Sequence, residues 1–284
     1  MSGQPPAAAA GSLTIGGDLR VRRMGFGAMR LTGKGVWGEP PDPDVARAVL
    51  RRAVELGVNL IDTADSYGPE VSERLIGETF SPLPAGLVVA TKAGFRRSGP
   101  GRWHADGRPA RLKAACDGSL ARLGVDRIDL YQLHTVDRRV PIEDSVGALA
   151  ELKAAGKVRH VGLSNVSTDE LARAGAVTGI VSVQNRYNLG DRASRAVLDA
   201  CERDGLAFIP WYPLGTGSLT RAGSRASRVG AAIGASGAQV ALAWLLASSP
   251  VMLPIPGTGS IEHLEENVAA AELRLPAEAM AELT

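Results

Sequence analysis

Eight short apolar stretches alternate with longer amphipathic ones along most of the chain. They span residues 24–26, 59–61, 87–91, 128–133, 158–163, 181–184, 207–211 and 252–255. Each is apolar on both faces, which is typical of a parallel strand covered by helices. Eight strand–helix units in 284 residues approach the length of ~250 residues that is usual for a closed barrel. The alternation therefore predicts an α/β fold, a (β/α)8 TIM barrel.

The segments between these strands have the pattern of surface helices. In the first, Val45, Val49, Ala53 and Leu56 fall on one side of a helix. Ser167 and Glu170 are spaced as in a capping box, which marks the start of a later helix. Four glycines follow expected helix ends, where a left-handed residue is favoured: Gly57, Gly124, Gly156 and Gly205.

The N-terminal region carries two further expectations. Residues 13–21 are expected to form a β-hairpin that turns at Gly16 and Gly17. Residues 1–12 are rich in Ala, Pro and Gly and are expected to be a flexible tail. They lack the basic start and long apolar core of a signal peptide. Residues 13–284 are then expected to form a single barrel domain.

A doubly wound open sheet is the main competing fold. Such a sheet normally binds a dinucleotide through a glycine fingerprint after its first strand, and the third glycine opens a helix. The segment 25–29, Gly-Phe-Gly-Ala-Met, has no such third glycine. The glycine- and serine-rich segment 214–227 is predicted to be a mobile loop over the mouth of the barrel, because strands resume after it.

Composition narrows the class of protein. The net charge is +2 and the arginines are scattered among acids, so no nucleic-acid-binding surface is expected. The two cysteines, Cys116 and Cys201, give neither a disulfide framework nor metal-ligand spacing. No apolar stretch is long enough to span a bilayer. These features favour a cytoplasmic protein with no metal and no membrane partner.

Four chemically active side chains lie at or just past the ends of three expected strands. Asp62 and Tyr67 belong to the sequence Asp-Thr-Ala-Asp-Ser-Tyr-Gly at 62–68, and Lys92 and His134 end the next two strands. Strand ends of a parallel barrel open on one face, where active sites are built. Taken singly, each residue has an ordinary structural explanation. Together, in this order, they predict an active site.

The motifs as a set resemble the aldo-keto reductase family. They comprise residues 62–68, 91–92, 133–134, 162–165, 184–185 and 213–215, and the resemblance covers nearly the whole chain. With residues 255–258, the pattern is most similar to bacterial members that resemble pyridoxal reductases. The resemblance implies NADP(H)-dependent reduction of an aldehyde or ketone to an alcohol.

The four side chains suit that reaction. Hydride addition to a carbonyl leaves an alkoxide that must be protonated, and Tyr67 is the expected proton donor. A free phenol has a pKa of about 10, and Lys92 is expected to lower it. Asp62 is expected to pair with Lys92. His134, expected to be neutral, would hydrogen-bond the substrate oxygen.

By resemblance, Ser164, Asn165 and Gln184 bind the nicotinamide carboxamide, because their side chains offer donors and acceptors. Trp211 stands where the family usually has a stacking Tyr, and Tyr212 where Ser is common. The other expected cofactor-binding residues are Gly27, Ala28, Met29, Asp62, Pro213, Leu214, Gly215, Ser218, Ile255, Gly257, Thr258, Gly259, Ser260, His263, Glu266 and Asn267.

The chain departs from the family where the 2′-phosphate of NADP would bind. Many relatives carry Lys in place of Gly257 and Arg in place of His263. The helix N-terminus that follows Ser260 still favours an anion. Three loop arginines are candidates to supply the missing charge: Arg221, Arg225 and Arg228. NADP(H) is predicted over NAD(H).

The predicted substrate pocket is apolar and aromatic. Its expected wall includes Met29, Trp37, Phe95, Trp103 and residues 100–109, which suits a small aromatic carbonyl such as pyridoxal. The expected partner is thus a small-molecule carbonyl substrate, and a monomer is favoured. Two alternatives stay open: an NADP(H)-binding redox-sensing regulatory subunit with little turnover, and a phosphate-handling lyase or isomerase without nicotinamide.

Overall fold

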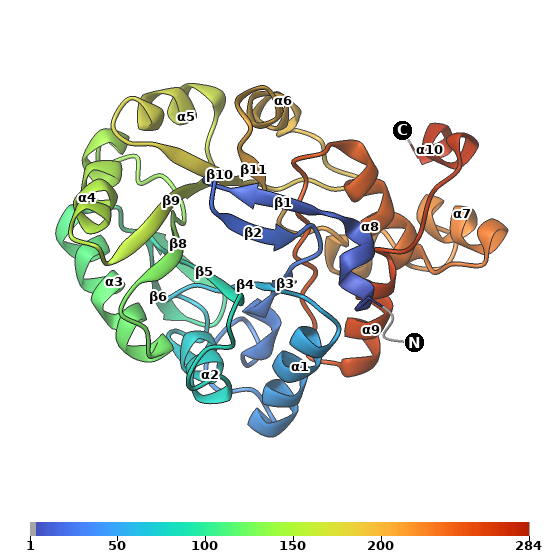
Figure 1. Ribbon diagram of the computed structural model, residues 1–284, viewed down its shortest axis with the longest axis horizontal. Coiled ribbons are helices and arrows are strands. Elements are labelled where there is room, and N and C mark those ends of the chain that lie inside the picture. The colour runs from blue at the N-terminus through green and yellow to red at the C-terminus, as the bar shows by residue number, and fades with distance from the viewer. Residues whose placement is uncertain (1–3, 284) are drawn as a thin grey trace.

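Seven parallel strands form the curled sheet that the sequence predicts. The computed structural model describes residues 4–283. The strands lie side by side in chain order, as β3 (Phe26–Gly27), β4 (Leu60–Asp62), β5 (Val88–Ala93), β8 (Ile128–Leu133), β9 (Val158–Ser164), β10 (Ile180–Gln184) and β11 (Ala207–Phe208). Every one of them overlaps a predicted strand. The sheet curls into the centre of a ring of helices (Figure 1).

Residues 251–256 close the barrel between β11 and β3. On one side the N–H of Phe208 donates to Val251 O over 2.9 Å. On the other side, Gly25 N donates to Pro254 O over 3.0 Å and Gly27 N to Pro256 O over 3.2 Å. Leu253 N donates back to Phe208 O over 2.9 Å, but Pro254 and Pro256 have no N–H to donate, so residues 251–256 form no regular ladder.

The closure brings two backbones so near each other that both must be glycine. A Cβ added to Gly27 would lie 2.7 Å from Ile255 O, and one added to Gly257 would collide with Gly27 O. No other residue fits here without displacing backbone. A lysine at position 257 would therefore require the backbone to shift at this point of the closure.

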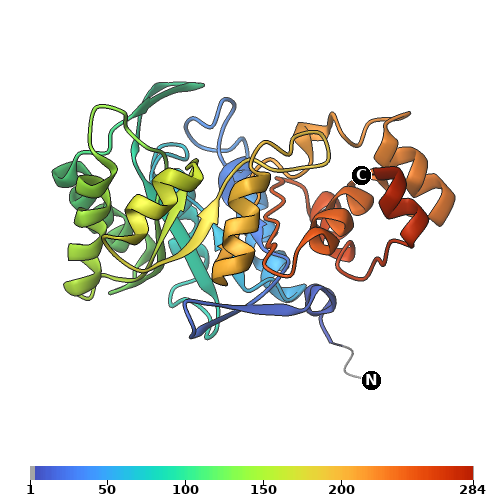
Figure 2. The ribbon, with the colours of Figure 1, turned by 90° about the horizontal axis from the view of Figure 1, so that it is seen from above.

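Helices surround the sheet (Figures 1 and 2). They are α1 (Pro43–Glu55), α2 (Val71–Thr79), α3 (Pro109–Leu123), α4 (Ile142–Ala154), α5 (Thr168–Gly175), α6 (Arg195–Asp204), α8 (Gly237–Ser248) and α9 (Ile261–Ala269). Two more, α7 (Arg225–Ile233) and α10 (Ala277–Leu283), pack against each other to one side. Within the described residues, no single helix has the length and apolar composition to cross a membrane. Helices α7 and α8 have that length and composition only when taken together, and they are bent by 97° relative to each other.

The expected helix boundaries are confirmed. The capping box of Ser167 and Glu170 opens α5. The four glycines after helices all have positive φ, from 66° at Gly124 to 90° at Gly57. Contrary to expectation, Val45 does not share the buried side of α1 with Val49 and Ala53, because it is 44% exposed. The buried face of this helix consists of Ala46, Val49, Leu50 and Ala53.

Two hairpins lie at opposite ends of the barrel (Figure 2). The predicted one, β1 (Ser12–Ile15) with β2 (Leu19–Arg22), packs Ile15, Leu19 and Val21 against buried residues of the sheet. The other, β6 (Phe95–Gly99) with β7 (Arg102–Ala105), was not predicted, since its residues were expected to form a loop. It rises beside the ends of the strands where the active site was expected.

The start of the chain differs from the expected flexible tail. Residues 1–3 lie outside the described residues, and Pro6–Ala10 form the 3-10 helix η1. Ala7 is fully buried, and its N–H donates to Leu56 O over 3.1 Å. The guanidinium of Arg274 also donates to Ala9 O over 2.7 Å. Further along, the predicted loop 214–227 contains the short helix η3 (Gly215–Gly217), and its last residues already belong to α7.

Candidate active site

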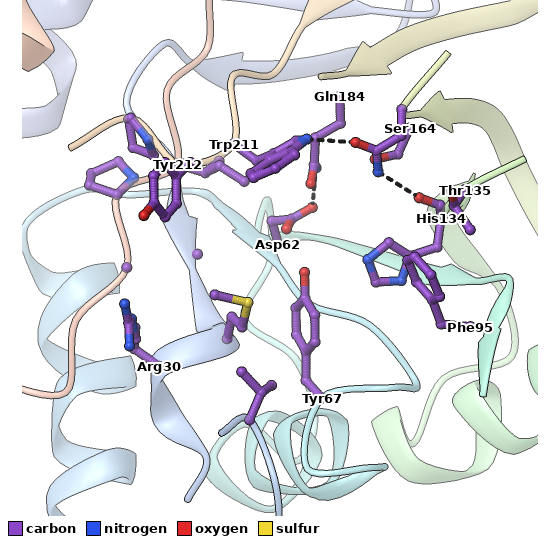
Figure 3. A pocket seen from close by; sticks show the side chains of 18 of the residues that line it. Arg30, Asp62, Tyr67, Phe95, His134, Thr135, Ser164, Gln184, Trp211 and Tyr212 are labelled. Carbon is purple, nitrogen blue, oxygen red and sulfur yellow. Dashed lines mark hydrogen bonds between the residues drawn. The ribbon is translucent and has the colours of Figure 1, made fainter. Parts of the chain in front are cut away.

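A cavity of about 720 Å³ opens at the end of the barrel where the strands terminate. Residues at or just past the ends of five strands line it, among them Asp62 and His134, and Tyr67 joins them from the loop after β4. Figure 3 shows these three side chains converging on one space. Lys92 lies directly behind them with no exposed surface. The structure thus brings together all four predicted catalytic residues.

Lys92 is fully engaged by three oxygen atoms. Its Nζ lies 2.6 Å from Asp62 Oδ1, 2.7 Å from Thr63 O and 3.4 Å from the Tyr67 hydroxyl. A buried ammonium is costly unless its charge is paired and its hydrogens are bonded. Both conditions are met, so the cation is fixed beside the phenol.

Asp62 is held from two further sides. Its Oδ2 accepts a hydrogen bond from Gln184 Nε2 over 2.8 Å and another from Gln132 Nε2 over 3.3 Å. Gln132 was not predicted. It lies two positions before His134 on β8, on the same face of the strand, and this alternation could have placed it inside the barrel.

The titration of Tyr67 differs from the sequence expectation. Burial raises the pKa of Tyr67 above its ordinary value, and although the Lys92 ammonium lowers it, burial is the stronger effect. The predicted net lowering is therefore wrong, because the sequence does not reveal how completely the phenol is buried. Burial likewise lowers the pKa of Lys92, but Asp62 and Tyr67 more than offset this and raise it. Tyr67 therefore keeps its proton and Lys92 its charge near neutral pH.

His134 is neutral, as predicted. Burial lowers its pKa well below the ordinary value, and the charges of Lys92 and Arg97 lower it further. Its Nδ1 lies 3.3 Å from Ser66 Oγ. The rings of Phe95 and Tyr67 meet the imidazole edge-on, with centroids 4.8 Å and 5.7 Å away. A neutral imidazole can donate one hydrogen bond to a carbonyl oxygen.

The aromatic wall comes from the unpredicted hairpin. Phe95 and Trp103, both predicted as substrate residues, line the cavity together with Met29. Trp37, also predicted, lies outside the cavity lining, 5.7 Å from the guanidinium of Arg97. Val36 lines the cavity in its place, with a positive φ of 56° that is unusual for a β-branched residue.

Arg97 joins the loops that form this wall. Its guanidinium stacks on Trp103 at 3.6 Å. It donates to Val36 O over 2.8 Å and to Ser66 O over 2.9 Å. The planar fork of arginine suits such a bridge between backbone carbonyls. The wall is thus tied to the segment that carries Tyr67.

Most of the expected cofactor residues near the strand ends line the cavity. They are Gly27, Met29, Asp62, Ser164, Asn165, Gln184, Trp211, Tyr212, Pro213, Leu214, Ile255 and Gly257. The others lie outside its lining: Ala28, Gly215, Ser218, Thr258, Gly259, Ser260, His263, Glu266 and Asn267.

The polar atoms of Asn165 are engaged within the protein. Its Nδ2 donates to His134 O over 3.0 Å and to Ser164 Oγ over 3.1 Å, and its Oδ1 accepts from Trp211 Nε1 over 2.9 Å. Asn165 therefore fixes the indole plane and the Ser164 hydroxyl. Its positive φ of 59° is a conformation that asparagine tolerates better than most residues.

The three loop arginines do not supply charge to this cavity. Arg221 and Arg225, together with Ser218, line a second cavity of about 440 Å³. Arg228 donates to Gly223 O over 2.9 Å. The proposed compensation for the missing cations at 257 and 263 is therefore not seen at the main cavity.

Arg30 is the cation that sequence reasoning missed. It belongs to the 3-10 helix η2 (Ala28–Leu31) and lines the cavity beside Pro256 and Gly257. Figure 3 shows its guanidinium on the side of Tyr212. Among the described residues that line the cavity, it is the one arginine or lysine. No hydrogen bond or ion pair with another described residue occupies it, so it is available to an anion. Thr135 is a further unpredicted lining residue.

The site offers no ready-made metal centre in the part of the chain that the structure describes. No group of three or more His, Cys, Asp or Glu side chains is suitably placed for a metal ion within residues 4–283. The polar groups that line the cavity are instead hydroxyls, amides, one imidazole, the Asp62 carboxylate and the Arg30 guanidinium, a mixed set that suits an organic ligand.

Comparison with known proteins identifies the protein family that the chain matches. The aldo/keto reductase family model matches residues 23–284. Pyridoxine 4-dehydrogenase of Escherichia coli is 45% identical over 273 residues, covering 94% of this chain and 95% of that protein. An uncharacterised oxidoreductase of Schizosaccharomyces pombe is 50% identical over 277 residues, covering 98% and 90%.

Solved structures agree with this assignment. A glycerol dehydrogenase from Gluconobacter oxydans superposes with a TM-score of 0.88 at 26% identity, covering 97% of this chain and 94% of that one. An aldo/keto reductase from Klebsiella pneumoniae, solved with NADP and acetate, has a TM-score of 0.81 at 27% identity, covering 96% and 93%.

Proposed function

Because this chain belongs to the aldo/keto reductase family, we propose that it uses NADPH to reduce a small aromatic aldehyde, with pyridoxal as the leading candidate. The observation that carries the proposal is the Tyr67 hydroxyl. It is kept protonated by burial, lies 3.4 Å from the Lys92 ammonium and borders the cavity beside a neutral imidazole.

The proton is supplied by Tyr67. As the substrate carbonyl becomes an alkoxide, the phenolic proton passes from Tyr67 Oη to the substrate oxygen, and a phenolate remains. Lys92 stabilises that phenolate at short range, where little solvent screens the charge. Asp62 holds the ammonium in place, so the donor is arranged before the reaction begins.

The polar groups near Trp211 fit a nicotinamide. Ser164 Oγ accepts from Asn165 and still has a proton to donate, while Gln184 gives its amide N–H to Asp62 and keeps its carbonyl oxygen. A carboxamide needs one donor and one acceptor of this kind. The indole face of Trp211 offers a stacking surface. When bound there, NADPH would supply the hydride.

Arg30 is proposed to bind the pyrophosphate, which NADPH and NADH share. It lies within the same cavity as Tyr67 and Trp211, and arginine pairs well with phosphate oxygens. The 2′-phosphate is assigned to the start of α9. There Ser260 caps the helix by accepting from His263 N, and unpaired N–H groups of a first turn favour an anion.

The substrate class follows from the wall of the cavity. Phe95, Trp103 and His134 present aromatic surfaces on one side, which suits a planar aromatic aldehyde. The similarity to a pyridoxine 4-dehydrogenase at 45% identity supports pyridoxal as the first compound to test.

Following NADPH absorbance with a panel of carbonyl compounds tests the proposal. We expect turnover with pyridoxal and related aromatic aldehydes, and slower turnover with small aliphatic ones. Tight NADPH binding without turnover of any carbonyl would instead favour a redox-sensing subunit. Failure to bind NADPH at all would favour a barrel enzyme that needs no nicotinamide.

A further inference from the structure

We propose that Ser66 is a positioning residue that sets the tautomer of His134. Its hydroxyl donates to Nδ1, so the neutral imidazole carries its proton on Nε2 and can donate it to the substrate oxygen. The inference rests on the proposed carbonyl reduction, because only there does the position of this proton matter.

The two side chains form an isolated buried pair. Ser66 is 2% exposed and His134 7% exposed, and Ser66 Oγ lies 3.3 Å from His134 Nδ1. Burial lowers the pKa of His134, so the ring holds a single N–H. In a neutral imidazole one nitrogen donates and the other accepts. Whichever role Ser66 assigns to Nδ1, Nε2 therefore takes the opposite one.

The direction of this hydrogen bond follows from the surroundings of the hydroxyl. Within residues 4–283, Ser66 Oγ has no hydrogen-bond partner except His134. If it accepted from an Nδ1–H, its own O–H would be buried without an acceptor, which carries the full desolvation cost of a donor. If it donates to Nδ1, its O–H is satisfied and an oxygen lone pair remains unused. A missing partner is tolerated better by an acceptor than by a donor.

Packing restricts rotation of the His134 imidazole ring. The rings of Phe95 and Tyr67 pack against it edge-on, at centroid distances of 4.8 Å and 5.7 Å. The backbone carbonyl of His134 accepts from Asn165 Nδ2 over 3.0 Å. With the ring held in place, its partner at Nδ1 selects the tautomer rather than the ring orientation.

Ser66 is itself held in register. Its backbone oxygen accepts from Arg97 Nη1 over 2.9 Å, and Arg97 also bonds the Val36 carbonyl. Ser66 directly precedes Tyr67, so one pinned segment supplies the proton donor and aligns the second group that contacts the carbonyl. A carbonyl oxygen only accepts hydrogen bonds. An unprotonated Nε2 would therefore place two acceptors face to face, which is repulsive.

Nitrogen-15 NMR of histidine-labelled protein in its NADPH complex tests the assignment. The chain has four histidines, so the His134 signals can be identified with a His134→Gln variant. We expect wild-type His134 to be protonated at Nε2. Ser66→Ala should give a mixture of both tautomers, whereas Ser66→Thr, which keeps a hydroxyl, should retain the wild-type form. Unchanged signals from the other three histidines verify that each variant is folded.

Kinetics provide the second readout. In Ser66→Ala we expect kcat to fall by about two- to tenfold, which corresponds to one neutral hydrogen bond, with an unchanged dissociation constant for NADPH. A wild-type ring protonated at Nδ1, or an alanine variant with wild-type tautomer and kcat, would overturn the inference. The NMR result does not depend on turnover, so absence of carbonyl reduction would refute the proposed function without affecting the tautomer assignment.

Discussion

Gln184 at the end of β10 donates a hydrogen bond to Asp62 at the end of β4 across the mouth of the barrel, over 2.8 Å. Asp62 in turn holds Lys92 at 2.6 Å. The residue proposed to accept from the nicotinamide is therefore two hydrogen bonds from the ammonium that supports Tyr67. Cofactor binding and proton donation therefore share one hydrogen-bond network. Substitutions at different points of this network should separate the two functions.

Replacing Gln184 should affect both cofactor binding and turnover, whereas replacing Gln132 should affect turnover alone. Gln184→Leu removes a donor to Asp62 and the proposed acceptor for the cofactor, so we expect weaker NADPH binding and a lower kcat. Gln132→Leu removes the other donor to Asp62 but lies outside the cavity lining. It should lower kcat with an unchanged dissociation constant. Fluorescence titration gives the NADPH dissociation constants of the two variants, and steady-state kinetics give their kcat. Equal weakening of NADPH binding in both variants would show that Gln184 does not contact the cofactor.

Removing the cation should destabilise the fold as well as slow the reaction. Lys92→Met leaves the Asp62 carboxylate buried without its ion-pair partner, and breaking a buried pair from one side costs about 3–5 kcal/mol. The double variant with Asp62→Asn removes the unpaired charge and should recover part of that loss. Urea unfolding measures both. A single variant as stable as the wild type would show that this ion pair is not needed for stability.

The buried carboxyl of Asp65 should make stability depend on pH. Burial, with the charge of Glu73 nearby, raises the pKa of Asp65 to about 7 from 3.8. Its Oδ1 has no hydrogen-bond partner within the described residues. An acid whose pKa is raised on folding binds its proton more tightly in the native state, so the contribution of Asp65 to stability is fully present below pH 4 and is lost as pH rises from about 4 to 7.

Asp65→Asn removes this proton linkage and serves as the comparison. Between pH 5 and pH 8 we expect the wild type to lose about 3 kcal/mol of stability relative to the variant. Arg111 pairs with Asp65 over 3.1 Å and becomes unpaired in the variant at both pH values, so the difference isolates the titration. Parallel stability profiles for the two proteins would rule out a raised pKa.

Arg30 and His263 should differ in which cofactor they affect. Arg30→Ala removes a charge-assisted contact to the shared pyrophosphate, which we expect to weaken NADPH and NADH binding alike by about tenfold. His263→Ala, at the start of α9, should weaken NADPH binding only. Dissociation constants for both cofactors with both variants provide the test. An Arg30 effect restricted to NADPH would instead assign this residue to the 2′-phosphate.

The barrel and its four central side chains could be predicted from local sequence. Asp62, Tyr67, Lys92 and His134 each have an ordinary explanation alone, but their order at or just past the ends of three apolar strands predicts an active site. The hairpin β6–β7 was missed, although the Gly99-Pro100-Gly101 turn and the alternating burial on either side of it are the pattern of an exposed hairpin. The glycines and prolines there are equally typical of a loop, which is why the sequence alone does not distinguish the two.

What could not be predicted depends on tertiary packing. The pKa of Tyr67 is set more by burial than by its neighbour Lys92, and residues distant in the sequence, such as Trp103 and His134, pack against the phenol ring. Trp37 is excluded from the cavity because Val36 turns with a positive φ and Arg97 lies beside the indole. Arg30 is one of many arginines in the sequence, and only closure of the barrel next to Gly257 gives it a place in the cavity.

Replacing Tyr67 tests its role as the proton donor most directly. We expect Tyr67→Phe to bind NADPH with an unchanged dissociation constant and to lose about 10²–10⁴-fold in kcat for aldehyde reduction, the usual contribution of a general acid. This variant keeps the ring and its packing but lacks the hydroxyl that Lys92 contacts. A Tyr67→Phe variant that reduces the aldehyde at the wild-type rate would exclude Tyr67 as the proton donor.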